Sequence, residues 1–181
     1  MRARPVILTV GAVVVMGVVA VAGWDFLQLG RRVPPPVPAP ERATAILVDK
    51  GARRMTLMRG ATALKTYDVA LGASPIAHKQ REGDGRTPEG TYAIDFKNPK
   101  SRFHLALRIS YPNANDRQRA ERNGTPPGGD IMIHGLPNGL GWLGRWHLKR
   151  DWTDGCIAVT DAQIEEIWAM VDVGTRIDIR P

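Results

Sequence analysis

Cysteine is almost absent from this sequence: Cys156 is the only one among 181 residues. A single cysteine excludes an internal disulfide. Aromatic residues are also scarce, at 6%, whereas there are 19 glycines and 14 prolines. This composition indicates one turn-rich globular domain with many short elements, plus an appendage, and excludes a coiled coil or a bundle of long helices.

Metal-binding and nucleic-acid-binding patterns are missing as well. No two of the four histidines are spaced i, i+4, and one cysteine cannot form a CxxC pair, so we expect no metal and no cofactor. Lys and Arg outnumber Asp and Glu by 25 to 18, which favours an anionic partner. Because no zinc-finger, helix-turn-helix or aromatic-basic pattern is present, we expect no binding of nucleic acid.

The first 30 residues have the pattern of an export signal. Arg2 and Arg4 precede residues 6–22, which are apolar except for Thr9 and would span about 26 Å as a helix. The segment is either a signal peptide cleaved after Ala22 or a retained signal-anchor that contacts the membrane through residues 6–27. We favour the anchor, because the apolar stretch is longer than that of most cleaved signals. Both alternatives predict an exported domain.

Residues 31–42 read as a linker. Five prolines in residues 33–40 (VPPPVPAP) fix the backbone and remove amide donors. We therefore expect an extended polyproline spacer that holds the domain, residues 43–181, away from the membrane.

The domain itself shows mostly the two-residue alternation of half-buried strands. This alternation predicts strands at residues 45–48, 54–58, 64–71, 91–96, 103–109, 130–133 and 176–180. A short exposed helix is expected at residues 113–123. A second helix begins at Thr160, which forms a capping box with Gln163, and its apolar residues recur at helical spacing up to Val171. The sum is a mainly-β domain with short helices at its margin.

Cys156 is the first candidate for chemistry. It follows a polar turn that contains Gly155, and it lies four residues before the helix cap at Thr160. A lone cysteine can be a small buried apolar residue, but a turn can also present a thiol and donate amides to a substrate. As a nucleophile the thiol, with an ordinary pKa of about 8.5, needs a base beside it.

His134 is the best candidate for that base, because the preceding residues 131–133 form a strand that sets it in place. His147 lies among three cations and is expected to be a neutral, solvated loop residue. We expect His78 and His104 to matter least.

Three segments together resemble a known family. Residues 83–90 (GDGRTPEG), 133–135 (IHG) and 153–157 (TDGCI) are similar, in this order, to motifs of the L,D-transpeptidase catalytic domain of the YkuD type, over about residues 44–179. The resemblance implies a β-sandwich catalytic domain without a cofactor. It assigns Cys156 as the nucleophile, His134 as the base, Gly135 as the residue whose carbonyl orients the imidazole, and Gly155 as the glycine before the nucleophile.

The resemblance also implies a substrate. Family members act on bacterial peptidoglycan stem peptides, through a thioester that an amine of another stem or of a wall-attached protein resolves. Thr153, Asp154, His147 and Trp142 are the expected substrate-binding residues. Two alternatives stay open: a carboxypeptidase or amidase in which water resolves the thioester, and a non-catalytic wall-binding module tethered to the membrane. The location would be periplasmic, either anchored in the inner membrane or free after cleavage.

The sequence departs from the family pattern in two places. Asp154 stands where the family commonly has His, and the 22-residue interval between His134 and Cys156 is longer than expected. Ala158 stands where the family usually has Arg or Asn, so a polar contact is missing. Residues 83–90 either flank the catalytic cleft or form only a turn before the strand that begins near Thr91.

Overall fold

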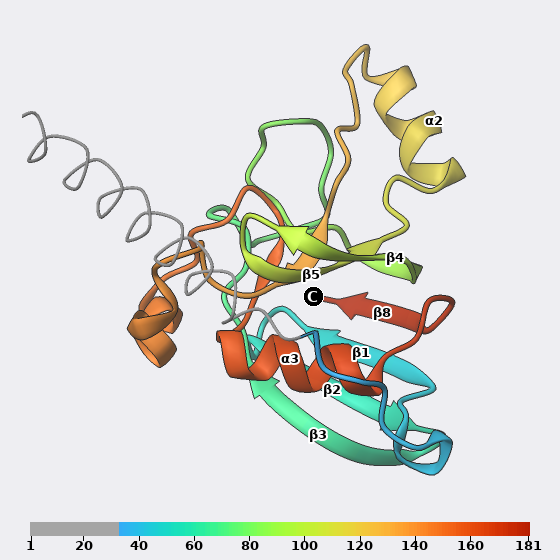
Figure 1. Ribbon diagram of the computed structural model, residues 1–181. Coiled ribbons are helices and arrows are strands. Elements are labelled where there is room, and N and C mark those ends of the chain that lie inside the picture. The colour runs from blue at the N-terminus through green and yellow to red at the C-terminus, as the bar shows by residue number, and fades with distance from the viewer. Residues whose placement is uncertain (1–32) are drawn as a thin grey trace, which may run out of the picture. The chain divides into compact units, whose positions relative to one another are not determined.

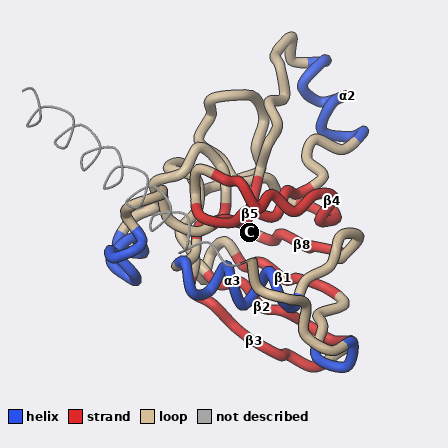
Figure 2. The backbone as a smooth tube through the Cα atoms, in the orientation of Figure 1, coloured by secondary structure: helices blue, strands red, loops and turns tan. Residues whose placement is uncertain are grey.

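The structure is a computed structural model that describes residues 33–181 (Figure 1). Within these residues the chain forms two α-helices, two 3-10 segments and eight strands, and Figure 2 shows how strands and loops alternate. The elements are η1 (Ala39–Glu41), β1 (Ala45–Asp49), β2 (Arg54–Arg59), β3 (Thr62–Asp68), β4 (Gly90–Ser101), β5 (His104–Ile109), α2 (Ala114–Arg122), β6 (Met132–His134), η2 (Gly141–Lys149), β7 (Ile157–Ala158), α3 (Asp161–Met170) and β8 (Arg176–Arg180).

The strands form one sheet in the order β3-β2-β1-β8-β4-β5-β6-β7. The long strand β4 pairs with β8 through residues 90–93 and with β5 through residues 94–101, where the register shifts twice. Such bulges bend a strand and increase its twist. The mainly-β class is confirmed, but the strands make one curled sheet rather than the two separate sheets of a sandwich, because β4 continues from one half into the other.

Helix α3 covers the inner face of the curled sheet and closes the core (Figure 1). Its capping box is present: the Thr160 side chain accepts from the Gln163 amide, and the Gln163 side chain accepts from the Thr160 amide. Ile164 and Ile167 are fully buried against apolar residues of β5 and β6. The helix therefore fixes the position of β6, the strand that carries His134.

The end of the predicted linker packs on the domain. The Val37 amide donates to the Ala169 carbonyl over 3.0 Å, and Arg42 binds both the Val37 carbonyl and Asp172. The predicted membrane segment, residues 6–27, lies outside the described residues. No helix within residues 33–181 has the length and apolar composition needed to cross a bilayer.

Candidate active site

The parallel pair β6–β7 brings Cys156 and His134 together. Ile133 lies opposite Ile157 and His134 opposite Ala158 in this pair, and both isoleucines face the core. Because side chains alternate along a strand, His134 and Cys156 point to the opposite face from the isoleucines. There they line the same cavity, of about 300 Å³.

A backbone contact fixes the orientation of the His134 ring. Its Nδ1 atom lies 2.6 Å from the carbonyl oxygen of Gly135, the contact that the family resemblance implies. Since a carbonyl can only accept, Nδ1 carries the hydrogen and Nε2 keeps its lone pair. Phe103 and Trp152 pack on the ring, with centroid distances of 4.5 and 5.8 Å. The imidazole is therefore held as a base with Nε2 available.

Burial keeps both groups neutral in the resting site. It lowers the pKa of His134 to about 4, although the hydrogen bond to Gly135 acts in the other direction. Burial also raises the pKa of the Cys156 thiol, and the negative charge of Asp154 adds to this effect. The structure therefore holds a thiol beside a neutral imidazole, not a preformed ion pair.

The loop before Cys156 has a fixed shape that requires glycine at position 155. Gly155 has a φ of +123°, and a Cβ atom on it would lie 2.5 Å from the Arg86 carbonyl oxygen. The Thr153 hydroxyl donates to the Cys156 carbonyl and accepts from the Gly155 amide. The Gly155 amide is thus occupied within the loop. The Cys156 amide has no acceptor among the described residues and can serve an incoming oxygen.

Residues 83–90 lie behind this loop rather than along the cavity, because the Arg86 carbonyl packs against Gly155. Asp84 accepts from three backbone amides and from Lys79. Burial alone would raise the pKa of Asp84, but these hydrogen bonds lower it to about 2. The segment therefore supports the nucleophile loop from within.

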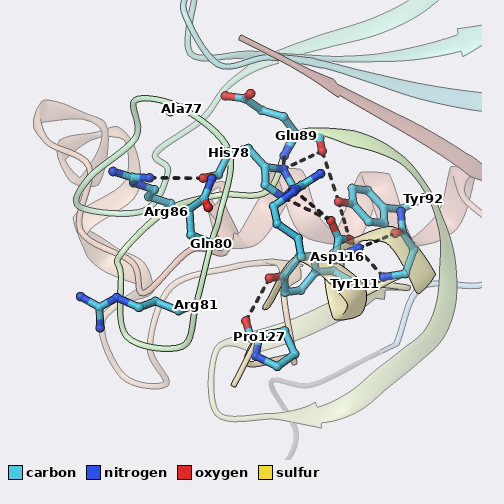
Figure 3. Close-up of polar contacts among 12 residues, drawn as sticks. Ala77, His78, Gln80, Arg81, Arg86, Glu89, Tyr92, Tyr111, Asp116 and Pro127 are labelled. Atoms are coloured by element: carbon cyan, nitrogen blue, oxygen red, sulfur yellow. Dashed lines mark hydrogen bonds and ion pairs between the residues drawn. The ribbon is translucent and has the colours of Figure 1, made fainter. Parts of the chain in front are cut away.

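A polar cluster ties the same segment to α2 (Figure 3). His78 Nδ1 lies 3.0 Å from the Glu89 amide, and Nε2 lies 3.1 Å from Asp116. The Tyr92 hydroxyl donates to the other oxygen of Asp116 over 2.9 Å. His78 therefore helps to hold residues 83–90 in position and does not belong to the cavity of Cys156 and His134.

The four expected substrate-binding residues lie in different places. Thr153 is buried and bonded within its own loop, whereas Asp154 is exposed next to Cys156. Trp142 is 78% exposed and does not line the cavity of Cys156. Only Asp154 is close to the thiol and also open to solvent.

The expectation of a solvated His147 was wrong. His147 is 8% exposed and lines a second, mostly apolar cavity of about 250 Å³. The Trp152 indole N–H donates to His147 Nδ1 over 3.4 Å, and the same indole makes an edge contact with the His134 ring. Arg145 and Lys149 are exposed to solvent, whereas Arg150, also exposed, lines the same cavity as His147.

Several cavity residues were not indicated by any motif. The end of β4 contributes Asn98, Lys100 and Ser101, and the turn that follows contributes Arg102 and Phe103. Asp130, just before β6, and Met132, its first residue, also line the cavity. The only signal in the sequence is a polar turn between two alternating stretches. Among the described residues, no group of three or more His, Cys, Asp and Glu side chains could hold a metal ion.

Comparison with known proteins identifies the family of this domain. Residues 43–179 match the model of the family described as "YkuD: L,D-transpeptidase catalytic domain". A curated protein of Escherichia coli (strain K12), named "Putative L,D-transpeptidase YafK", is 31% identical over 110 residues, which are 60% of this chain and 37% of that protein. The chain thus matches little more than a third of the length of this relative.

Two solved structures share the fold. The helical cell shape determining protein Pgp2 from Campylobacter jejuni has a TM-score of 0.57 at 23% identity, covering 86% of this chain and 54% of that one. Bd1075 from Bdellovibrio bacteriovorus has a TM-score of 0.54 at 24% identity, covering 82% and 51%. At these identities the likeness concerns the fold.

Proposed function

This chain belongs to the L,D-transpeptidase catalytic domain family, and from this premise we propose that it transfers acyl groups of peptidoglycan stem peptides through a thioester on Cys156. The observation that carries the proposal is the pairing of Cys156 with His134 in one cavity, with His134 Nε2 free to take a proton.

In the first half of the reaction the thiol attacks the carbonyl carbon of the third stem residue. His134 Nε2 takes the thiol proton as the sulfur–carbon bond forms, and the Cys156 amide donates to the developing oxyanion. When the tetrahedral intermediate collapses, the carbon–nitrogen bond breaks and His134 returns the proton to the leaving amine of the terminal D-Ala. The product is an acyl-enzyme thioester and a neutral imidazole.

The second half depends on what attacks the thioester. An amine gives a cross-link or attaches the stem to a wall protein, whereas water gives hydrolysis. Position 158, where a polar contact is missing, informs this choice. Ala158 is fully buried, and its amide and carbonyl both bond with Ala70. The backbone thus supports the nucleophile loop without a side chain at 158, which favours an intact transferase.

The choice between transfer and hydrolysis is tested by the product ratio. Muropeptides that carry tetrapeptide stems are incubated with the protein, with and without an excess of acceptor amine, and the products are quantified by mass spectrometry. We expect cross-linked product that increases with acceptor. Free tripeptide as the sole product, in an amount that added acceptor does not change, would establish a hydrolase instead.

We propose further that the domain acts outside the inner membrane. The charged and apolar pattern of residues 2–22 supports export. Protease added to spheroplasts is then expected to digest the domain, and amino-terminal sequencing of the mature protein decides between an anchor and cleavage after Ala22. A domain that the protease leaves intact until the membrane is lysed would refute this topology. Pgp2, which shares the fold, is described as a cell shape determining protein, and a role in wall organisation is consistent with this location.

A further inference from the structure

We propose that Lys100 and Arg102 form a carboxylate-binding subsite for the donor stem peptide, an inference that rests on the proposed function above. Lys100 lies next to the last residue of β4 and Arg102 lies in the turn that follows, and both line the cavity of Cys156 and His134. They are separated from both catalytic residues in the sequence and belong to none of the family motifs quoted above.

The charges of this turn are unpaired. Lys79 and Arg53 each contact a carboxylate, Asp84 and Asp151 respectively. Lys100 and Arg102, by contrast, bind no carboxylate within residues 33–181 and are both exposed at the cavity. Two cations side by side repel each other, so an anion that reaches both of them gains from each.

The turn is also fixed relative to the catalytic strand. Asn138, which follows His134 by four residues, donates from its amide to the Arg102 carbonyl over 2.9 Å and from its side chain to the Ser101 carbonyl over 3.2 Å. Its side-chain oxygen accepts from the His104 amide over 3.0 Å. The Ser101 hydroxyl accepts from the Phe103 amide within the turn. These hydrogen bonds hold the backbone that carries Lys100 and Arg102 in a fixed position relative to the segment that follows His134.

The other charge of the cavity orients the ligand. Asp130 lines the same cavity, and its carbonyl oxygen lies 3.7 Å from the Cys156 sulfur. A substrate carboxylate is repelled at the Asp130 end and attracted at the Lys100 and Arg102 end. Ala158, at the position where the family usually has Arg or Asn, is buried and adds no positive charge to this cavity. The turn is thus the cationic side of this cavity, and an anionic group of the substrate lies there.

The ligand chemistry is a free carboxylate. The fork of Arg102 can bind both oxygens of a carboxylate, and Lys100 adds a point charge. In a stem peptide this group is either the carboxylate of the terminal residue that leaves or a side-chain carboxylate on the residue whose carbonyl is attacked.

The subsite is tested by kinetics with Lys100→Gln and Arg102→Gln. Substrates are a tetrapeptide stem with a free terminal carboxylate, the same peptide with a terminal amide, and a peptide whose third residue has no side-chain carboxylate. We expect each substitution to raise KM about tenfold with little change in kcat, the loss of one charged hydrogen bond. The substrate that lacks the bound carboxylate should give the same KM with wild type and variants, which identifies its source. Arg102→Lys should retain part of the affinity.

The matched control is Arg122→Gln, which removes an exposed cation of α2 outside the cavity. If Lys100→Gln and Arg102→Gln have the same KM as the Arg122→Gln control on every substrate, the subsite proposal is overturned. Binding is also measured without turnover, by calorimetry with the tetrapeptide acid and Cys156→Ser protein. If wild type turns nothing over, the proposed function fails. In that case the subsite is judged from binding alone. It stands if adding Lys100→Gln or Arg102→Gln to the Cys156→Ser protein weakens the binding of the tetrapeptide acid, and it fails if the binding is unchanged.

Discussion

Replacing Cys156 by Ser is expected to abolish turnover and to leave the domain folded. A hydroxyl is close in size to a thiol but far less acidic, so His134 cannot generate a comparable nucleophile. We expect initial rates on tetrapeptide stems to fall by at least about a thousandfold. The thermal unfolding curve should stay close to that of wild type, because the side chain faces a cavity and not the core.

Two readouts make this test decisive. Intact-protein mass spectrometry should show an acyl adduct on wild type and none on Cys156→Ser. Activity retained by the variant would exclude Cys156 as the nucleophile. Wild-type protein that binds wall fragments but never forms an adduct would identify a non-catalytic wall-binding module.

The second large effect is expected at His134. Replacing it by Gln removes the His134 Nε2 atom that takes the thiol proton in the proposed mechanism, and general base catalysis of this kind contributes about 10² to 10⁴ in rate. The comparison variant is His147→Gln, which alters the second cavity behind Trp152 and should cost much less. A larger rate loss for His147→Gln, with unfolding curves that match, would show that the wrong histidine is assigned as the base.

The pH dependence follows from the burial of His134. With a folded-state pKa of about 4, the imidazole stays neutral and active down to nearly that pH, so kcat/KM should decline on the acid side near 4 rather than near 6.5. The same shift affects stability. Because the folded-state pKa of His134 lies below its unfolded-state pKa, the contribution of the neutral imidazole to the free energy of unfolding is complete above about pH 6.5. That contribution is lost as the pH falls toward 4. In denaturant melts the free energy of unfolding of wild type should fall between pH 6.5 and 4 through this group. His134→Gln lacks the group and should not show this part of the decrease.

Local sequence patterns were enough to predict most of the elements. Alternating apolar residues predicted β1, β2, β4, β5 and β8. The two helices begin where the sequence predicted them, at Asn113 and Thr160, and each has a capping box there. Cys156 and His134 were selected by residue type and by position at the ends of elements. The sheet pairing then explains why they meet, since their strands are parallel neighbours.

What the sequence could not indicate depends on tertiary contacts. Strand β7 has two residues, too few for any periodicity, and it exists because Ala158 pairs with Ala70 and lies beside His134. His147 is surrounded by cations along the chain, yet folding of η2 buries it against Trp152. Lys100 and Arg102 reach the site only when the β4–β5 hairpin lies beside β6.

The place of β8 in the sheet has a consequence for the timing of folding. Residues 176–180 are added last among the strands, yet β8 lies in the middle of the sheet, parallel to β1 and antiparallel to β4. Until these residues emerge from the ribosome, β1 and β4 have no strand between them and the two halves of the sheet cannot join. A domain whose last strand completes its centre folds late and through contacts of long sequence separation. The sheet therefore cannot be completed before residues 176–180 are available to pair with β1 and β4.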